Sequence, residues 1–149
     1  MMPDTIHATC VVRDGVAILI TGRPGRGKSR LALRLMHAGC ALLADDRVLL
    51  AGGPVEAHTP PQPPGTRLGH ALLEVRGLGL VEYRHASPAP VRLVIDLDRA
   101  PERLPEPCRD KRTGAPVLVL DPDDPAAVER TLTALDCAIG ILRLHTTPT

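Results

Sequence analysis

The stretch ILITGRPGRGKSRLALRL, from Ile18 to Leu35, places a glycine-rich turn between an apolar run and a helical pattern. It satisfies the Walker A pattern G-x-x-x-x-G-K-[ST] in the strand, turn and helix context in which that pattern forms a P-loop. The backbone N–H groups of such a turn point at phosphate oxygens, and the helix N-terminus adds a favourable dipole. The stretch therefore predicts a phosphate-binding loop made of Gly22, Arg23, Pro24, Gly25, Arg26, Gly27, Lys28 and Ser29.

Lys28 and Ser29 are the residues of this loop with the most specific expected roles. We expect Lys28 to bridge the β and γ phosphates of a nucleotide, and Ser29 to bind Mg²⁺ through its hydroxyl. Arg23 and Arg26 lie in the same loop. They are either solvated or add positive charge beside the phosphates, and the sequence favours neither reading.

The residues around the loop predict the start of an α/β fold. Asp14-Gly15 is a tight-turn dipeptide and predicts a hairpin within residues 8–22, whose continuously apolar second strand is buried on both faces. A helix over 29–38 follows, with Gly39 as its cap, and a strand over 40–46 returns roughly parallel to the first. We expect a P-loop kinase-like core with a mixed, largely parallel sheet and flanking helices.

The rest of the chain continues the same domain, which we expect to span residues 1–149. Residues 47–58 predict a hairpin around a Gly-Gly pair, and the proline-rich residues 59–66 predict irregular structure. Two further strands, VRLVIDLD and APVLVLD, are separated by a long polar loop over 99–114. A final helix is expected to run from Pro125 to Leu144, with Asp124 as its N-cap.

Composition narrows the classes of partner. The chain has 149 residues, 44% of them hydrophobic, which is enough for a core, and its net charge of +1 gives no electrostatic reason to expect nucleic acid or membrane binding. Aromatic residues make up only 1%, so bases have almost nothing to stack on. The four cysteines form no C-x-x-C pair, and no signal peptide or membrane span is visible. These features predict reduced thiols and a cytoplasmic location.

Two adjacent carboxylates end the expected strand over 40–46. Asp45 and Asp46 stand where its carboxyl end meets the phosphate loop, which is the edge at which α/β sheets bind ligands. A carboxylate there binds Mg²⁺ or accepts the proton of an attacking hydroxyl, and two of them permit both. The alternative is that one of the pair only forms the turn before Arg47.

Together with the phosphate loop and the Asp45-Asp46 pair, the stretch ALLEVRGLGL resembles the HPr kinase/phosphorylase family, bacterial enzymes that use a P-loop domain to phosphorylate a serine of the phosphotransfer protein HPr. The family signature L-E-[IV]-R-G-L-G stands here as Leu73, Glu74, Val75, Arg76, Gly77, Leu78 and Gly79. The resemblance covers about residues 7 to 105. It is to the short, α-proteobacterial form, in which the catalytic domain stands alone.

The resemblance implies roles for particular residues. Asp46 matches the family's catalytic base, and His7 matches its active-site histidine. Glu74 would be a Mg²⁺ ligand together with Ser29 and Asp45, and Arg103 falls where the family has a further active-site arginine. Gly77 and Gly79 are expected to shape the floor where donor and acceptor meet. The residues alone leave His7 as a strand histidine and Glu74 as a surface charge as alternatives.

The resemblance also implies ATP and Mg²⁺ as cofactors, an HPr-like phosphocarrier as substrate and a homo-oligomer, hexameric in the family. Two departures qualify it. No P-V-x-P-G-R-N segment, which supports phosphorolysis in the family, follows the strand APVLVLD, so the kinase function is carried over and the phosphorylase function is not. Pro24 and Arg30 replace the family's usual Ser and Glu.

Two other functions remain open at this point. One is a small-molecule kinase or NTPase on the same P-loop core, although the chain shows only short proline-rich loops where such kinases insert a lid. The other is a nucleotide-sensing regulator that binds ATP without transferring phosphate.

Overall fold

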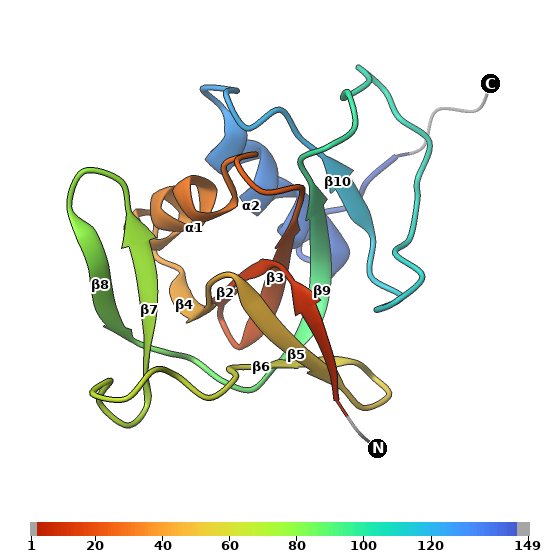
Figure 1. The fold of residues 1–149 in the computed structure, drawn as a ribbon. Coiled ribbons are helices and arrows are strands. Elements are labelled where there is room, and N and C mark those ends of the chain that lie inside the picture. Colours follow the sequence, from red (N-terminus) through yellow and green to blue (C-terminus); the bar gives the residue numbers. More distant parts are fainter. Residues whose placement is uncertain (1–2, 146–149) are drawn as a thin grey trace.

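The computed structural model describes residues 3–145 of the chain (Figure 1). The elements follow in the order β1 (Asp4–His7), β2 (Thr9–Arg13), β3 (Val16–Thr21), α1 (Lys28–His37), β4 (Ala41–Ala44), β5 (Arg47–Ala51), β6 (Glu56–His58), β7 (His70–Val75), β8 (Gly79–Arg84), β9 (Ala89–Asp96), β10 (Val117–Val119) and α2 (Ala127–Ala138). The main sheet has the order β1-β5-β6-β9-β3-β2-β4, with β10 beside β9. Strands β7 and β8 form a separate two-stranded sheet.

Strand β3 lies inside the sheet and is covered on both faces, as its apolar sequence predicts. Ile18 and Ile20 pack on the side of α1 and α2, whereas Ala17 and Leu19 contact the cluster to which β1, β5 and β6 contribute. Figure 1 shows both helices on one side of β3 and β9, and β5 and β1 crossing the other side. Both faces of β3 are therefore buried between residues 17 and 20, and the loop that follows the strand starts from the core.

The mixed α/β fold class is confirmed, with one refinement of the sheet. Only the β3–β9 and β9–β10 pairs are parallel, and the remaining pairs of the main sheet are antiparallel. The predicted return of β4 in the direction of β3 is correct, but β2 lies between the two strands and pairs antiparallel with both. The early hairpin occupies the position that a parallel neighbour was expected to take.

The predicted α2 is wrong at both ends. Pro125 and Ala126 form a turn, because the Asp124 carboxylate accepts the backbone N–H of Ala126 at 2.8 Å, and the helix begins at Ala127. At the other end Gly140 has a φ of 85°, a conformation that ends a helix. Helix α1 begins and ends within one residue of its predicted bounds, and Gly39 follows it with a φ of 109°.

Candidate active site

The eight residues predicted to bind phosphate lie on the loop between β3 and α1, residues 22–27, and on the first turn of α1, where Lys28 and Ser29 stand. Gly27 has a φ of 96°, and a side chain there would meet Pro122 at 3.3 Å. Gly22 lies against Leu97, which a Cβ atom would approach to 3.2 Å. The buried Lys28 ammonium donates hydrogen bonds to the carbonyl oxygens of Gly22 at 2.6 Å and Arg23 at 3.2 Å, so its charge lies within the loop.

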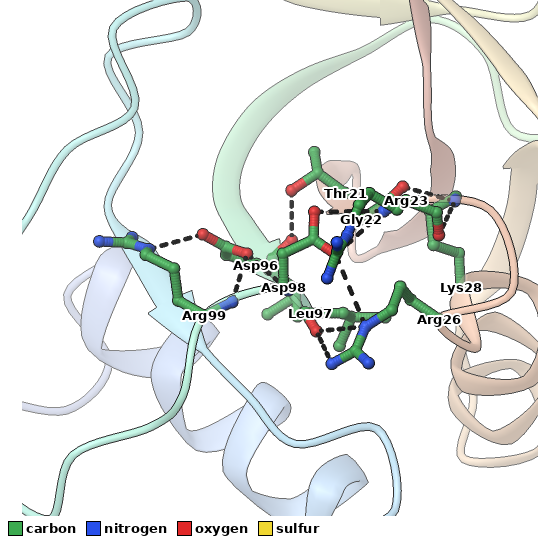
Figure 2. A network of polar contacts seen from close by, with 10 residues as sticks. Thr21, Gly22, Arg23, Arg26, Lys28, Asp96, Leu97, Asp98 and Arg99 are labelled. Carbon is green, nitrogen blue, oxygen red and sulfur yellow. Dashed lines mark hydrogen bonds and ion pairs between the residues drawn. The ribbon is translucent and has the colours of Figure 1, made fainter.

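Two arginines fasten this loop to the end of β9 (Figure 2). The Asp98 carboxylate accepts hydrogen bonds from the backbone N–H of Arg23, at 3.1 and 3.2 Å, and from its guanidinium at 3.4 Å. The Arg26 guanidinium donates to the Leu97 carbonyl oxygen at 3.1 and 2.7 Å. The sequence left the roles of Arg23 and Arg26 open, and these contacts assign both side chains to holding the loop.

A second network supports that attachment. The Asp96 carboxylate accepts hydrogen bonds from the backbone N–H of Asp98 at 2.8 Å and from the Arg99 guanidinium at 2.7 Å. Partial burial raises the pKa of the Asp96 carboxyl, but the hydrogen bonds from Asp98 and Arg99 lower it by more, so the net shift is downward. The bend after β9 is thereby fixed where it contacts the phosphate loop.

The carboxylate of Asp45 connects the loop to two other parts of the chain. Its Oδ1 accepts the hydroxyl of Ser29 at 2.8 Å and the hydroxyl of Thr9 at 2.8 Å. Its Oδ2 faces the backbone N–H of Glu74 at 3.4 Å. Ser29 and Asp45, two of the predicted metal ligands, are thus in direct contact, and the backbone of the third, Glu74, lies beside them.

Asp46 points away from this network and toward His7. The Nδ1 atom of His7 lies 2.8 Å from the Asp46 carbonyl oxygen and 3.4 Å from its carboxylate. Because a carbonyl oxygen only accepts, Nδ1 carries the hydrogen in that contact. Asp46 has a φ of 70°, and its carboxylate is 68% exposed. Two of the predicted catalytic residues, His7 and Asp46, therefore lie together at the surface, where the Arg47 guanidinium also faces the Asp46 carboxylate at 4.0 Å.

The signature stretch forms the β7–β8 hairpin, and its turn, Arg76 to Leu78, lies at the tip. Leu78 is 75% exposed, and an added Cβ at Gly77 or Gly79 would meet no atom within 4 Å. The turn opens to solvent, so the expectation that the two glycines form the floor where donor and acceptor meet stays a prediction. Their positive φ values, 83° and 128°, allow the tight turn.

Among the described residues 3–145, Arg103 makes no hydrogen bond or ion pair with the residues of the Asp45 and Asp46 networks. It lies in the exposed loop between β9 and β10. The structure thus assembles His7, Asp45 and Asp46 with the phosphate loop.

Two residues of the site were missed by the sequence reasoning. Thr9 is fully buried and bonds Asp45, and Asp98 holds the phosphate loop. The sequence did carry a signal for Thr9 that was not used, because Thr9 is the lone polar residue in the apolar run of residues 8–12. For Asp98 the sequence carried no comparable signal. The predicted strand VRLVIDLD ends with two carboxylates, Asp96 and Asp98, and nothing in the pattern shows which of them contacts the phosphate loop.

Arg30 stands where the family usually has Glu. It contacts the segment after β10, the place where the family's P-V-x-P-G-R-N motif is missing. Its guanidinium donates to the Pro122 carbonyl oxygen at 2.6 Å and to the Asp123 carboxylate at 2.7 Å. The two departures from the family pattern are therefore neighbours in space, and residues 121–124 lie against the start of α1.

The donor set at the loop fits Mg²⁺. Within the described residues 3–145, no group of three or more His, Cys, Asp or Glu side chains is placed to hold a metal ion. Mg²⁺ at nucleotide sites is commonly held by one or two protein oxygens together with substrate phosphates, and the Ser29 hydroxyl and Asp45 carboxylate supply such oxygens.

The remaining sequence expectations concern thiols and membranes. Cys10, Cys40, Cys108 and Cys137 are all free, and burial raises the pKa of the Cys10 thiol. Neither α1 nor α2, the helices of the described residues 3–145, has the length and apolar character of a membrane span.

Comparison with known proteins gives one family. The family model described as HPr Serine kinase C-terminal domain matches residues 2–89. Proteins named HPr kinase/phosphorylase from Bordetella petrii and Bordetella pertussis are 45% and 46% identical over 83 residues, which cover 54% of this chain and 25% of each relative. The chain thus aligns with about a quarter of the length of these curated relatives.

A solved structure extends the similarity in fold beyond residue 89. The Hpr(Ser) kinase/phosphatase from Coxiella burnetii matches with a TM-score of 0.61 at 20% sequence identity, covering 95% of this chain and 99% of that chain. The elements after residue 89, including β9, β10 and α2, therefore fall within a shared fold.

Proposed function

The chain belongs to the family of HPr serine kinase C-terminal domains, and from this premise we propose that it is a Mg²⁺- and ATP-dependent protein-serine kinase acting on an HPr-like phosphocarrier. The curated relatives that it resembles are named HPr kinase/phosphorylase. The observation that carries the proposal is the meeting of two features at one edge of the sheet: the phosphate loop bound to Asp45 through Ser29, and the exposed Asp46 carboxylate beside His7.

In the proposed reaction the loop binds the nucleotide. Its backbone N–H groups and the Lys28 ammonium face the phosphates and stabilise the negative charge that develops on the transferred phosphoryl group. Mg²⁺, when bound at Ser29 and Asp45, neutralises part of the phosphate charge. The contacts of Arg23 and Arg26 with the end of β9 keep the loop in its binding conformation.

Asp46 is the proposed general base. The hydroxyl oxygen of the acceptor serine forms the new bond to the γ-phosphorus, the bond from that phosphorus to the bridging oxygen breaks, and ADP leaves. The hydroxyl proton passes to the Asp46 carboxylate as this happens. His7 is proposed to position Asp46 through its bond to the carbonyl oxygen. Glu74 and Arg103 are proposed to approach the phosphates only when both substrates are bound.

The accompanying proposals follow from the same family. We propose that residues 1–149 act as one catalytic unit, that this unit assembles with copies of itself, and that it works in the cytoplasm, where ATP and a phosphocarrier are available. Reverse phosphorolysis is not included, because the P-V-x-P-G-R-N segment is missing from the chain and residues 121–124 bond Arg30 at the comparable place.

The test is intact-mass spectrometry of an HPr-like protein from the same organism after incubation with this protein, ATP and Mg²⁺. We expect one added phosphoryl group on serine. The matched control is Asp46→Asn, because asparagine tolerates the positive φ of 70° at this position, whereas alanine does so poorly. Loss of a general base slows transfer by about 100-fold or more.

ATP affinity should survive in Asp46→Asn, because the loop and Lys28 bind the phosphates. Transfer by Asp46→Asn at the wild-type rate would remove Asp46 from the mechanism. ATP binding by the wild-type protein without transfer to the carrier would favour the nucleotide-sensing alternative, and phosphorylation of a sugar or nucleoside instead would favour a small-molecule kinase.

A further inference from the structure

We propose that Thr9 is a positioning residue whose hydroxyl holds the Asp45 carboxylate in the orientation needed to bind Mg²⁺ together with Ser29. The inference deepens the proposed function and rests on it, because it assumes that the phosphate loop takes a Mg²⁺-nucleotide. It assigns a role to a residue that the phosphate-loop pattern does not include.

Thr9 has the burial of a core residue and the chemistry of a site residue. Its side chain has an exposed fraction of 0%, and its neighbours Ala8 and Cys10 are equally buried. A hydroxyl in an apolar environment costs free energy unless it forms a hydrogen bond. The partner of the Thr9 hydroxyl is the Asp45 Oδ1 atom at 2.8 Å, so Thr9 directs its only polar group at the carboxylate.

The geometry at Asp45 shows what this bond controls. Oδ1 accepts two hydroxyls, from Thr9 on β2 and from Ser29 on α1, each at 2.8 Å. A hydroxyl has one proton to donate and two lone pairs to offer, so Ser29 donates to Asp45 and still has lone pairs for a cation. Thr9 approaches from the buried side. It therefore limits rotation of the carboxylate while the side facing Ser29 stays available.

The chain around Thr9 fixes Asp46 in a different way. The backbone N–H of Ala8 donates to the Asp46 carbonyl oxygen at 3.2 Å, and His7 bonds the same oxygen. These contacts hold the Asp46 backbone, whereas Thr9 is the one residue of this short segment, residues 7–9, that bonds the Asp45 side chain. Loss of the Thr9 hydroxyl should therefore weaken Mg²⁺-dependent binding and leave the Asp46 geometry intact.

The experiment measures ATP binding by calorimetry, once with Mg²⁺ and once with a chelator, and takes the ratio of the two dissociation constants. Thr9→Val removes the hydroxyl and keeps the shape, Thr9→Ala removes the hydroxyl with less crowding, and Thr9→Ser restores it. The control is Thr131→Val on α2, where another fully buried threonine hydroxyl has, among the described residues, the Ala127 carbonyl oxygen as its one partner, at 2.7 Å.

We expect the Mg²⁺ effect on ATP affinity to fall by about tenfold or more in Thr9→Val and Thr9→Ala, because a hydrogen bond to a charged group is lost. ATP affinity in the chelator should stay at the wild-type level. Thr9→Ser and Thr131→Val should keep the wild-type ratio. This pattern would separate a role at Asp45 from a role in core packing.

Three results would overturn the proposal. One is a folded Thr9→Val or Thr9→Ala variant in which the ratio of the ATP dissociation constants with Mg²⁺ and with chelator equals that of the wild type. Another is failure of both variants to fold, because Thr9 would then be needed for core packing and not for the orientation of Asp45. The third is a wild-type protein whose ATP binding ignores Mg²⁺, which would remove the proposed function as well. Failure of the wild-type protein to phosphorylate the carrier, with the expected Thr9 pattern, would remove only the substrate and keep the role of Thr9.

Discussion

Asp45 and Asp46 are adjacent in sequence but do different work because the backbone turns between them. Asp45 ends in contact with Ser29 and Thr9, whereas Asp46, at a φ of 70°, presents its carboxylate to solvent beside His7. Sequence reasoning identified both residues and the choice between metal binding and proton transfer. It did not predict which groups donate hydrogen bonds to the Asp45 carboxylate. The donors, the Thr9 hydroxyl and the Glu74 backbone N–H, come from other strands and meet Asp45 only in the folded chain.

The Asp96 carboxyl gives a prediction about pH. Its pKa is lowered in the folded protein, since the hydrogen bonds from Asp98 and Arg99 outweigh the effect of burial. A carboxyl of this kind contributes stability above its unfolded pKa of about 3.9 and loses that contribution as the pH falls through the folded pKa. We therefore expect Asp96→Asn to lower the free energy of unfolding at neutral pH, and the difference from wild type to shrink as the pH falls from about 5 to about 2.

Urea unfolding at a series of pH values measures this difference. Arg99→Gln is the companion variant, because it removes one of the donors to Asp96 and should reproduce part of the loss. A difference between wild type and Asp96→Asn that stays constant over the whole pH range would show that the ionised carboxylate has no part in stability.

At the scale of elements, turn dipeptides and helical periodicity predicted correctly those elements whose structure depends on residues close in sequence. The Asp14-Gly15 hairpin, the hairpin around Gly52 and the helix after the phosphate loop are all confirmed. The β7–β8 hairpin was not predicted, because the stretch ALLEVRGLGL was interpreted through its family signature and its alternating pattern was not used. Helix α2 was misplaced because the Asp124 side chain closes a turn instead of capping the helix.

The β7–β8 hairpin is attached to the rest of the protein by a small apolar cluster. Leu73, fully buried, packs with Ala71 and with Leu42 of β4, and Leu33 and Met36 of α1 border them. Leu73→Ala leaves a cavity in this cluster, so we expect the free energy of unfolding to fall by about 2–5 kcal/mol. Urea denaturation measures the change.

The exposed tip of the same hairpin provides the control for that variant. Leu78 is 75% exposed, and Leu78→Ala should change the free energy of unfolding by no more than about 0.5 kcal/mol. Equal losses in the two variants would mean that the tip is covered in solution, for example by a second copy of the chain.

At the scale of the whole molecule, the order of strands is the part that sequence could not supply. The sequence predicted strands on either side of the long connections but contained no signal for which pairs would meet. Strand β9 follows the β7–β8 hairpin in the chain, yet it lies between β3 and β6 in the main sheet. Pairing between distant segments depends on the whole apolar surface of each strand, and no local pattern encodes it.

The central place of β9 leads to a prediction about the limits of the fold. The family model matches only residues 2–89, but β9 pairs along β3 from Val91 to Asp96 and contributes Leu93 and Ile95 to the helix-side core. A fragment of residues 1–88 would leave one edge of β3 unpaired and its apolar faces open to water. We expect that fragment to lack cooperative unfolding and dispersed amide resonances.

A chain ending at Gly140 is the matched truncation, because the described residues that it loses include the exposed Ile141, Leu142 and Leu144. It should keep the thermal melt of the full chain and its ATP binding, since the phosphate loop is held by Leu97 and Asp98 at the end of β9. Cooperative folding of residues 1–88 would mean that the matched region is a folding unit in its own right. The phosphate loop would then be stable without β9. The contacts of Arg23 and Arg26 with Asp98 and Leu97 would adjust the conformation of the loop but would not be needed to form it.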